Sequence, residues 1–341
     1  MKNRVLLSPL CPLWCILFLL YSCDRREITY YAEAEFEIRI DWHNSGLDAE
    51  ESGNGATAIF YPQDGSAPKT VLMGDRTYEK VRLQTGRYDV LVFNRSFTDF
   101  GSLSFRGDCY RELEAYARHM ETRTDPETRT TTRVIVSSPE KLAADVLEDF
   151  EVTEEMLGNY STSSHSLNRS SDASGASGEF TLSFTPRKLT REVKVQVNVI
   201  GLNNIRKAAG TLTGVAESVN LSTGKVSAET VSQQFSLDEI TFTEGSPFNG
   251  TLTGYFNTFG FETEIPRQLH LQALLVDGKT TVNETFDITA HELEDEGGRL
   301  VLYIEVTAPP IADVKPEGGS DSGFDADVED WGDEEESELP L

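Results

Sequence analysis

Hydrophobic and polar residues alternate with a period of two along most of this chain. The clearest run lies within 191–201, where four valines at every second position are separated by Glu, Lys, Gln and Asn. Shorter runs of the same kind occupy 28–42 and 299–306, residues 87–93 are predicted as a further strand, and turns rich in Gly, Asn and Pro separate these segments. Such alternation is typical of strands that bury one face and expose the other. The pattern therefore predicts an all-β chain of antiparallel sandwiches.

A serine-rich stretch divides the chain into two parts. Residues 161–178 hold eight serines and two glycines, a composition typical of flexible connectors. We therefore expect an N-terminal β-sandwich over 28–160 and a C-terminal one over 179–312. Two short helices are expected in the first part. One covers 111–121, and the other covers 138–150, where Ser138 would be the N-cap before Pro139 at the first helical position.

The first 22 residues have the features of an export signal. Lys2 and Arg4 precede a mostly apolar segment that Pro9 and Pro12 interrupt, and its unbroken core is too short to span a bilayer. The segment ends in Leu-Tyr-Ser-Cys, and charged residues follow at once. This arrangement predicts a lipoprotein signal over 1–22, lipidation at Cys23 and a lipid-anchored N-terminus over 23–27. An ordinary cleaved signal, in which Cys23 is incidental, is the alternative.

The charge of the chain limits its partners. The formal net charge is −27 at pH 7, which argues against nucleic acid as a partner because such proteins carry a basic surface. Acidic residues concentrate in 313–341, where six Asp and six Glu accompany one Lys. We expect this stretch to be a flexible, solvated tail. The alternative is that its two large aromatic residues, Phe324 and Trp331, dock on a partner or on the second sandwich.

No catalytic or metal-binding pattern is present. The five histidines show no zinc-ligand spacing, and the chain has no nucleophile elbow, phosphate loop or dinucleotide fingerprint. After removal of the signal, two cysteines remain: Cys23, which is expected to be lipidated, and Cys109. We therefore expect no internal disulfide. We therefore expect no enzyme activity, no cofactor and no metal.

Several motifs resemble the fimbrillin-related lipoproteins of Bacteroidales, including the minor-fimbria anchor and accessory proteins. These motifs are the strand 191–201, the segments 210–221 and 256–260, the strand 88–94 and the Val-Glu-Asp-Trp of 328–331. The resemblance implies two transthyretin-like β-sandwich domains in tandem and a role in surface fibres, with the acylated member at the fibre base. Structural subunits of such fibres are cut after an Arg, and no such site is clearly marked in this chain.

The resemblance and the lipidation motif together give a functional expectation. We expect a cell-envelope lipoprotein on the outer membrane, exposed at the surface, that anchors or assists a fimbria through strand addition with a fimbrillin-like subunit. The alternative is a surface lipoprotein that binds a glycan or a host ligand, with Trp42, Tyr61 and Tyr78 as an aromatic platform. Core packing of these three aromatic side chains is the other interpretation.

Overall fold

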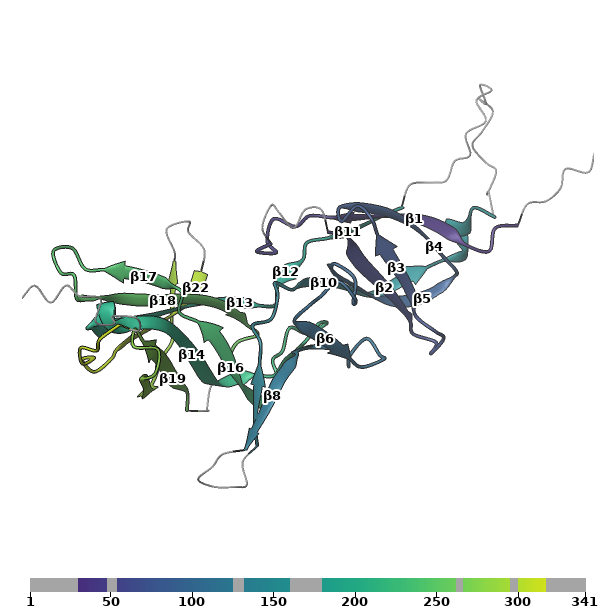
Figure 1. Ribbon diagram of the computed structural model, residues 1–341. Coiled ribbons are helices and arrows are strands. Elements are labelled where there is room, and N and C mark those ends of the chain that lie inside the picture. The colour runs from purple at the N-terminus through teal and green to yellow at the C-terminus, as the bar shows by residue number, and fades with distance from the viewer. Residues whose placement is uncertain are drawn as a thin grey trace, which may run out of the picture.

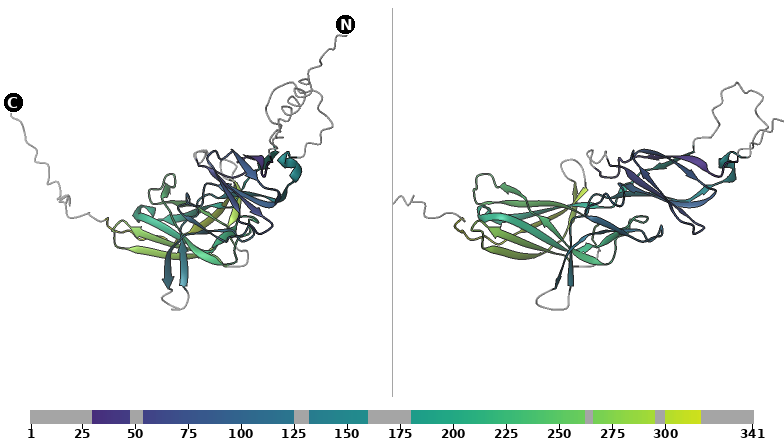
Figure 2. Two further views of the ribbon diagram at one scale, coloured as in Figure 1. Left: turned by 90° about the vertical axis from the view of Figure 1, so that its right-hand side faces the viewer. Right: turned by 45° about the vertical axis from the view of Figure 1, so that its right-hand side comes forward.

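The protein is built from strands that form two β-sandwiches arranged end to end (Figure 1 and Figure 2). The structure is a computed structural model that describes residues 30–47, 54–124, 132–159, 180–261, 266–294 and 300–316. Within these ranges the helical elements are two short 3₁₀ turns, η2 (Glu154–Leu157) and η3 (Leu202–Asn204). The all-β fold class predicted from the alternation is confirmed.

The N-terminal sandwich packs a three-stranded sheet, of order β11-β1-β4, on a five-stranded sheet, of order β12-β10-β5-β2-β3. Its strands are β1 (Ala34–Ile40), β2 (Ala56–Pro62), β3 (Lys69–Met73), β4 (Tyr78–Leu83), β5 (Gly86–Asn94), β10 (Ala143–Val152), β11 (Phe180–Phe184) and β12 (Arg187–Lys188). The first core lies between the two sheets and includes Phe36, Ile38, Phe60 and Val90, all nearly or fully buried.

A third, small sheet covers the outer face of the five-stranded sheet. It has order β15-β7-β6 and joins β6 (Leu103–Arg106) and β7 (Glu114–Ala117) to β15 (Ser218–Asn220) from the second half of the chain. The space beneath it is the junction core, which includes Leu91, Phe93, Leu103, Val219 and Leu221. Strand β5 is therefore buried on both faces, which explains why its sequence is an almost continuous apolar run.

The C-terminal sandwich packs a five-stranded sheet, of order β17-β18-β13-β22-β21, on a six-stranded sheet, of order β20-β19-β14-β16-β9-β8. Its strands are β8 (His119–Thr124), β9 (Thr132–Val136), β13 (Arg191–Ile200), β14 (Ile205–Ala216), β16 (Thr230–Ser236), β17 (Glu239–Phe242), β18 (Asn249–Thr258), β19 (Gln268–Leu275), β20 (Thr281–Asp287), β21 (His291–Glu294) and β22 (Leu300–Thr307). The four alternating valines of β13 all point into the C-terminal core, as their period predicts.

The division of the chain between the sandwiches differs from the one expected at 161–178. Strands β11 and β12, which follow that segment, pair with β1 and β10 of the N-terminal sandwich. Strands β8 and β9, which precede it, extend a sheet of the C-terminal sandwich, because β9 pairs in parallel with β16. The two halves of the sequence therefore exchange strands. The chain first contributes β8 and β9 to the C-terminal sandwich, returns to the N-terminal sandwich for β10 to β12, and enters the C-terminal sandwich again at β13.

The two helices expected in the first half are wrong. Residues 111–121 contribute to β7 and β8, and residues 138–150 contribute most of β10. Strand β10 resembles a helix in sequence because apolar residues occupy adjacent positions, Ala143 and Ala144, whose side chains enter the first core and the junction core respectively. A bulge follows Leu147, with Asp149 at a φ of 56°, and it further hides the period of two.

Three expectations fall outside the described residues. They are the export signal with Cys23, the serine-rich segment 161–178, and the part of the acidic tail after residue 316 with Phe324 and Trp331. In the described part of the chain, no helix is long and apolar enough to cross a membrane.

Candidate partner-binding edge

The aromatic platform expected from the sequence is not formed. The side chain of Trp42 belongs to the first core, and the residue is only 9% exposed. Its Nε1–H donates to the carbonyl oxygen of Arg76 at 2.8 Å, and the Arg76 guanidinium lies 5.9 Å from the ring centroid. The apolar body and the polar tip of this indole are thus both occupied within the fold.

Tyr61 and Tyr78 contact other parts of the fold than Trp42 does. Tyr61 packs on the junction core, on the opposite face of the five-stranded sheet, and its ring meets that of Tyr110 at 5.8 Å. Tyr78 is 37% exposed and donates its hydroxyl to Oε1 of Glu37 at 3.0 Å. The three rings therefore do not share a surface on which a sugar could stack.

The described residues hold no group of three or more His, Cys, Asp or Glu side chains placed to bind a metal ion. Cys109 is exposed as a free thiol.

Strand β17 is an edge strand whose inward side chains are left uncovered. It pairs with β18 and ends the five-stranded sheet, with Ile240 opposite Leu252 and Phe242 opposite Gly250. Residues directly opposite in a ladder share a face, and Leu252 is fully buried in the C-terminal core. Ile240 and Phe242 therefore face the core side of the sheet, yet they are 43% and 48% exposed.

The backbone of β17 presents unused hydrogen-bonding groups along the same edge. The N–H of Thr243 donates to the carbonyl oxygen of Asn249 at 2.9 Å, which marks these two residues as a hydrogen-bonded pair. Such pairs alternate along an antiparallel ladder, so Thr241 also bonds to β18. The N–H and C=O groups of Ile240 and Phe242 point away from β18, and β17 has no second strand neighbour among the described residues.

The hairpin loop adds a third apolar side chain to this edge. Phe248 is 57% exposed, and its carbonyl oxygen accepts hydrogen bonds from the N–H groups of Gly201 and Leu202 at 2.8 and 2.7 Å. These bonds fix the loop at the end of the sandwich farthest from the N-terminal sandwich (Figure 1). We call Ile240, Phe242 and Phe248, with the outward backbone of β17, the apolar edge.

Two other sheet edges, at β20 and β4, carry protection that the apolar edge lacks. At the β20 edge Glu284 lies on the core side between Val282 and Phe286, and an inward charge discourages pairing. At the β4 edge Lys80 and Arg82 hold Glu35 in ion pairs of 3.2 Å. Strand β17 has no basic residue and no inward charge.

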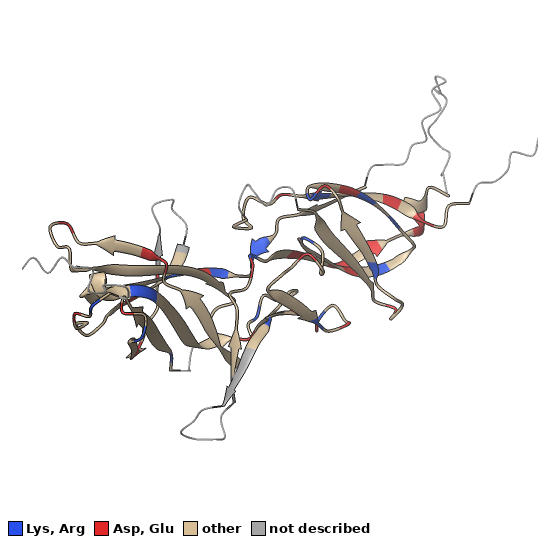
Figure 3. Cartoon of the chain, in the orientation of Figure 1, with Lys and Arg blue, Asp and Glu red and all other residues tan. Residues whose placement is uncertain are grey.

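The surroundings of the apolar edge are acidic. Asp238 and Glu239 lie at the start of β17, and Glu244 lies just beyond its end. Figure 3 shows acidic residues in red on the hairpin loop and at the start of this strand. A partner strand with apolar residues at alternate positions and Lys or Arg near its ends would complement this edge.

Sequence reasoning missed this edge. Phe242 and Phe248 stand out in the sequence as isolated aromatic residues, but the order of strands in a sheet decides which strand lies at its rim. A short alternation, Glu-Ile-Thr-Phe without a lysine, is the only local signal of an unprotected edge.

The family comparison gives one match over most of the chain. A family model described as "Domain of unknown function (DUF5119)" matches residues 22–236. The match covers both sheets of the N-terminal sandwich, the junction sheet and the C-terminal sandwich as far as β16.

Similar proteins come from species of Bacteroides and Porphyromonas. A Bacteroides ovatus protein named "Putative fimbrium anchoring subunit Fim4B" is 30% identical over 102 residues, so the aligned region spans 29% of this chain and 29% of that relative. A crystal structure of a "putative adhesin" from Bacteroides ovatus has a TM-score of 0.55 at 17% identity and covers 86% of this chain and 98% of that chain. This likeness shows that the two proteins share a fold.

A weaker match is the fimbrial anchor protein Mfa2 from Porphyromonas gingivalis. Its TM-score is 0.40 at 11% identity, with 79% of this chain and 95% of that chain covered. A TM-score of this size carries no weight for function.

Proposed function

We propose a function for this chain, which belongs to the DUF5119 family. It is a non-catalytic protein of a fimbria, with an anchoring or accessory role. The name of its Bacteroides ovatus relative, a fimbrium anchoring subunit, supports this assignment, and the motifs that resemble fimbrillin-related lipoproteins point the same way. The shared fold with a protein described as an adhesin is consistent with it.

The observation that carries the proposal is the apolar edge. An extended segment of a fimbrillin-like subunit would add to β17 as the next strand, bonding to the outward N–H and C=O groups of Ile240 and Phe242. Its alternate side chains would cover Ile240, Phe242 and Phe248, which the chain by itself leaves exposed. Exposed apolar edges are a hazard for a free protein, and a partner strand removes that hazard.

The proposal places the protein at the outer membrane. Acyl chains on Cys23 would attach the N-terminus, and the apolar edge lies at the opposite end of the molecule from the N-terminal sandwich (Figure 2). An attachment point at one end and a strand-accepting edge at the other suit a protein that holds a fibre to a surface.

The test removes one outward backbone N–H from β17. In Ile240→Pro the lost N–H points away from β18, and a sheet edge is where proline is tolerated. Ile240→Val keeps the N–H and is the matched control. Both variants, with the unmodified protein, are expressed in the native bacterium, crosslinked mildly and purified, and captured proteins are identified by mass spectrometry.

We expect the unmodified protein and Ile240→Val to capture a fimbrillin-like subunit and Ile240→Pro to lose it, with unchanged circular dichroism. Equal capture by Ile240→Pro and Ile240→Val would show that β17 is not the accepting edge. If the unmodified protein captures no fimbrial subunit at all, the proposed function is wrong.

A further inference from the structure

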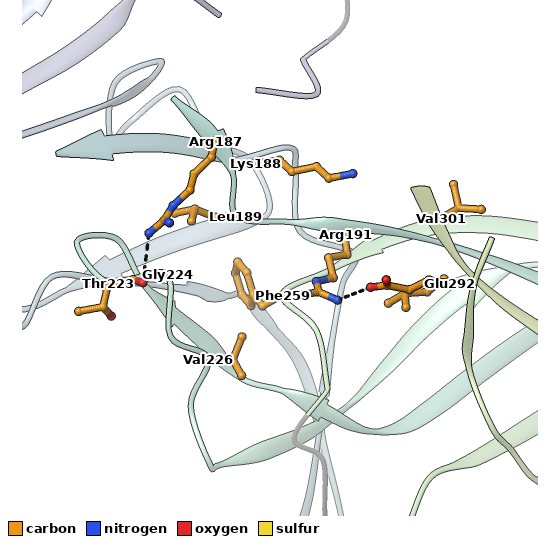
Figure 4. Close-up of a pocket in the computed structure, with 11 residues that line it drawn as sticks. Arg187, Lys188, Leu189, Arg191, Thr223, Gly224, Val226, Phe259, Glu292 and Val301 are labelled. Atoms are coloured by element: carbon orange, nitrogen blue, oxygen red, sulfur yellow. Dashed lines mark hydrogen bonds and ion pairs between the residues drawn. The ribbon is translucent and has the colours of Figure 1, made fainter. Parts of the chain in front are cut away.

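A pocket lies at the waist of the molecule, where the chain passes from the N-terminal to the C-terminal sandwich. Its volume is about 370 Å³, and Figure 4 shows the residues that line it. The floor is apolar and consists of Leu189, Val226, Phe259, Val301 and Leu302. Leu189 and Phe259 are nearly buried parts of the junction core, so the floor is a fixed surface.

The rim of this waist pocket is basic. Arg187, Lys188 and Arg191 place three cations within five positions, in a protein whose formal net charge is −27. Arg187 donates from Nη2 to the carbonyl oxygen of Thr223 at 3.3 Å, and Arg191 pairs through Nη1 with Oε1 of Glu292 at 2.9 Å. These bonds hold both guanidinium groups over the pocket, as the dashed lines in Figure 4 show.

The guanidinium groups remain accessible to a ligand. The side chain of Arg191 is 55% exposed, and each guanidinium has five N–H donors, of which the bonds above use few. An apolar floor beneath exposed arginines fits a ligand that combines an aromatic or aliphatic group with carboxylates, because arginine pairs with carboxylates and also stacks on aromatic rings.

The acidic tail of the same chain combines an aromatic side chain with carboxylates. Residues 317–341 contain eleven Asp or Glu and no Lys or Arg. Trp331 follows Glu329 and Asp330 and is followed by the four acidic residues 333–336. An indole within a run of carboxylates is the complement of an apolar floor with a basic rim.

The tail is long enough to reach the waist pocket. It starts at the far end of the C-terminal sandwich, where the N–H of Val314 donates to Oδ1 of Asn204 at 3.3 Å. Strand β13 spans the distance back to the waist with ten residues, or about 33 Å at about 3.3 Å per residue. The fifteen residues from 316 to 331 can extend to about 50 Å.

We propose that the acidic tail folds back and seats Trp331 in the waist pocket of its own chain, with the flanking carboxylates on Arg187 and Arg191. The pocket is thereby assigned an occupant, an acidic peptide with an aromatic anchor.

The experiment uses the full chain with p-benzoylphenylalanine in place of Trp331. Irradiation of the purified protein should crosslink residue 331 to segment 187–191, to 223–226 or to Phe259, which peptide mass spectrometry locates. In Arg187→Glu/Arg191→Glu the yield of this crosslink should fall about tenfold, since two charge-assisted contacts are replaced by repulsion. Lys207→Glu/Lys279→Glu changes the net charge equally on the same sandwich, away from the pocket, and should crosslink like the unmodified chain.

A second measurement does not depend on a folded charge-reversal variant. The same crosslink in the unsubstituted background should weaken in roughly 1 M salt, where the Debye length falls to about 3 Å. Mixing ¹⁴N- and ¹⁵N-labelled protein separates crosslinks within one chain from those between two copies. Crosslinks between copies, crosslinks to the apolar edge, or a yield that neither salt nor charge reversal changes would overturn the proposal. No fimbrial subunit is present in this experiment, so its failure leaves the proposed function open.

Discussion

At the scale of the residue, Gly210 shows how a missing side chain shapes the C-terminal core. It lies directly opposite Phe235 in the ladder between β14 and β16, and the Phe235 ring folds over it. A Cβ at position 210 would lie 2.2 Å from Cζ of that ring. The ring has no room to move, because it stacks on Phe256 with centroids 4.3 Å apart. Glycine at 210 is therefore required by close approach.

We expect Gly210→Ala to lower the free energy of unfolding by about 1–3 kcal/mol, the usual cost of overpacking a core. Urea denaturation measures the change. Gly74→Ala is the control, because a Cβ at position 74 meets nothing within 4 Å, and it should leave stability nearly unchanged. The double variant Gly210→Ala/Phe235→Leu removes the clashing ring atoms and should be less destabilised than the sum of its two single changes. Simple additivity would contradict the packing described above.

At the scale of the element, β13 and β10 show when a period of two can be read from a sequence. Strand β13 has the C-terminal core on one face and a more open surface on the other, so its pattern is clean. Strand β10 has cores on both faces and a bulge after Leu147, so its apolar residues follow no simple period. The strand can therefore be predicted from the sequence for β13 but not for β10.

The central position of β13 yields a prediction about its two faces. Val195 is fully buried, and β13 is paired on both sides, with β18 and with β22. Val195→Thr keeps the shape but buries a hydroxyl, which should cost about 1–3 kcal/mol of the free energy of unfolding. Gln196→Thr, one position along and on the other face, should cost far less. Equal losses in urea denaturation would mean that the face assignment is wrong.

At the scale of the whole molecule, the junction core ties the two sandwiches together. Strand β7 pairs with β15 and β9 pairs with β16, so ladders from both halves of the sequence close over this core. An ionic contact adds to it, because Nη2 of Arg106 lies 3.0 Å from Glu114 and 3.3 Å from Glu217. We expect the two sandwiches to behave as one body.

The junction core should make stability depend on alkaline pH. Burial, with smaller contributions from the charges of Cys109 and Asp108, raises the pKa of Tyr61 to about 12. Burial and the hydrogen bond to Glu148 also raise the pKa of Tyr110. In the unfolded chain a tyrosine ionises near pH 10. The folded state therefore holds these protons more tightly, and its stability is full below pH 10 and falls as the pH rises through about 12.

We expect the melting temperature to drop over this range and the drop to be smaller in Tyr61→Phe, which has no phenol to ionise at that position. Thermal unfolding between about pH 9 and 12 measures it, and absorbance of tyrosinate follows the ionisation directly. Tyr255→Phe, at a residue that is 51% exposed, is the control and should leave the pH dependence unchanged. An identical drop in Tyr61→Phe would rule out Tyr61 as a source.

The resemblance to fimbrial proteins and the strands that bury a single face could be recognised without a structure. The alternation of β13 follows from a local rule, that successive side chains point to opposite faces, and a local rule can be read from a linear string. Charge and the lack of zinc, phosphate or nucleophile motifs likewise depend on which residues are present. For the same reason the sequence could indicate that β5 is buried, but not by which elements.

Only the tertiary structure decided what depends on contacts between distant residues. The pairing of β1 with β11 crosses the segment that the sequence marks as a boundary, because strand pairing is set by the order of strands in a sheet rather than along the chain. The same order makes β17 an edge strand and leaves Ile240 and Phe242 partly exposed although they lie on the core side of the sheet. Burial likewise removes Trp42 from the surface, since it packs in the first core and bonds to the carbonyl oxygen of Arg76. Local pattern identified the strands that bury one face, such as β13, and long-range packing determined which strand carries the candidate site.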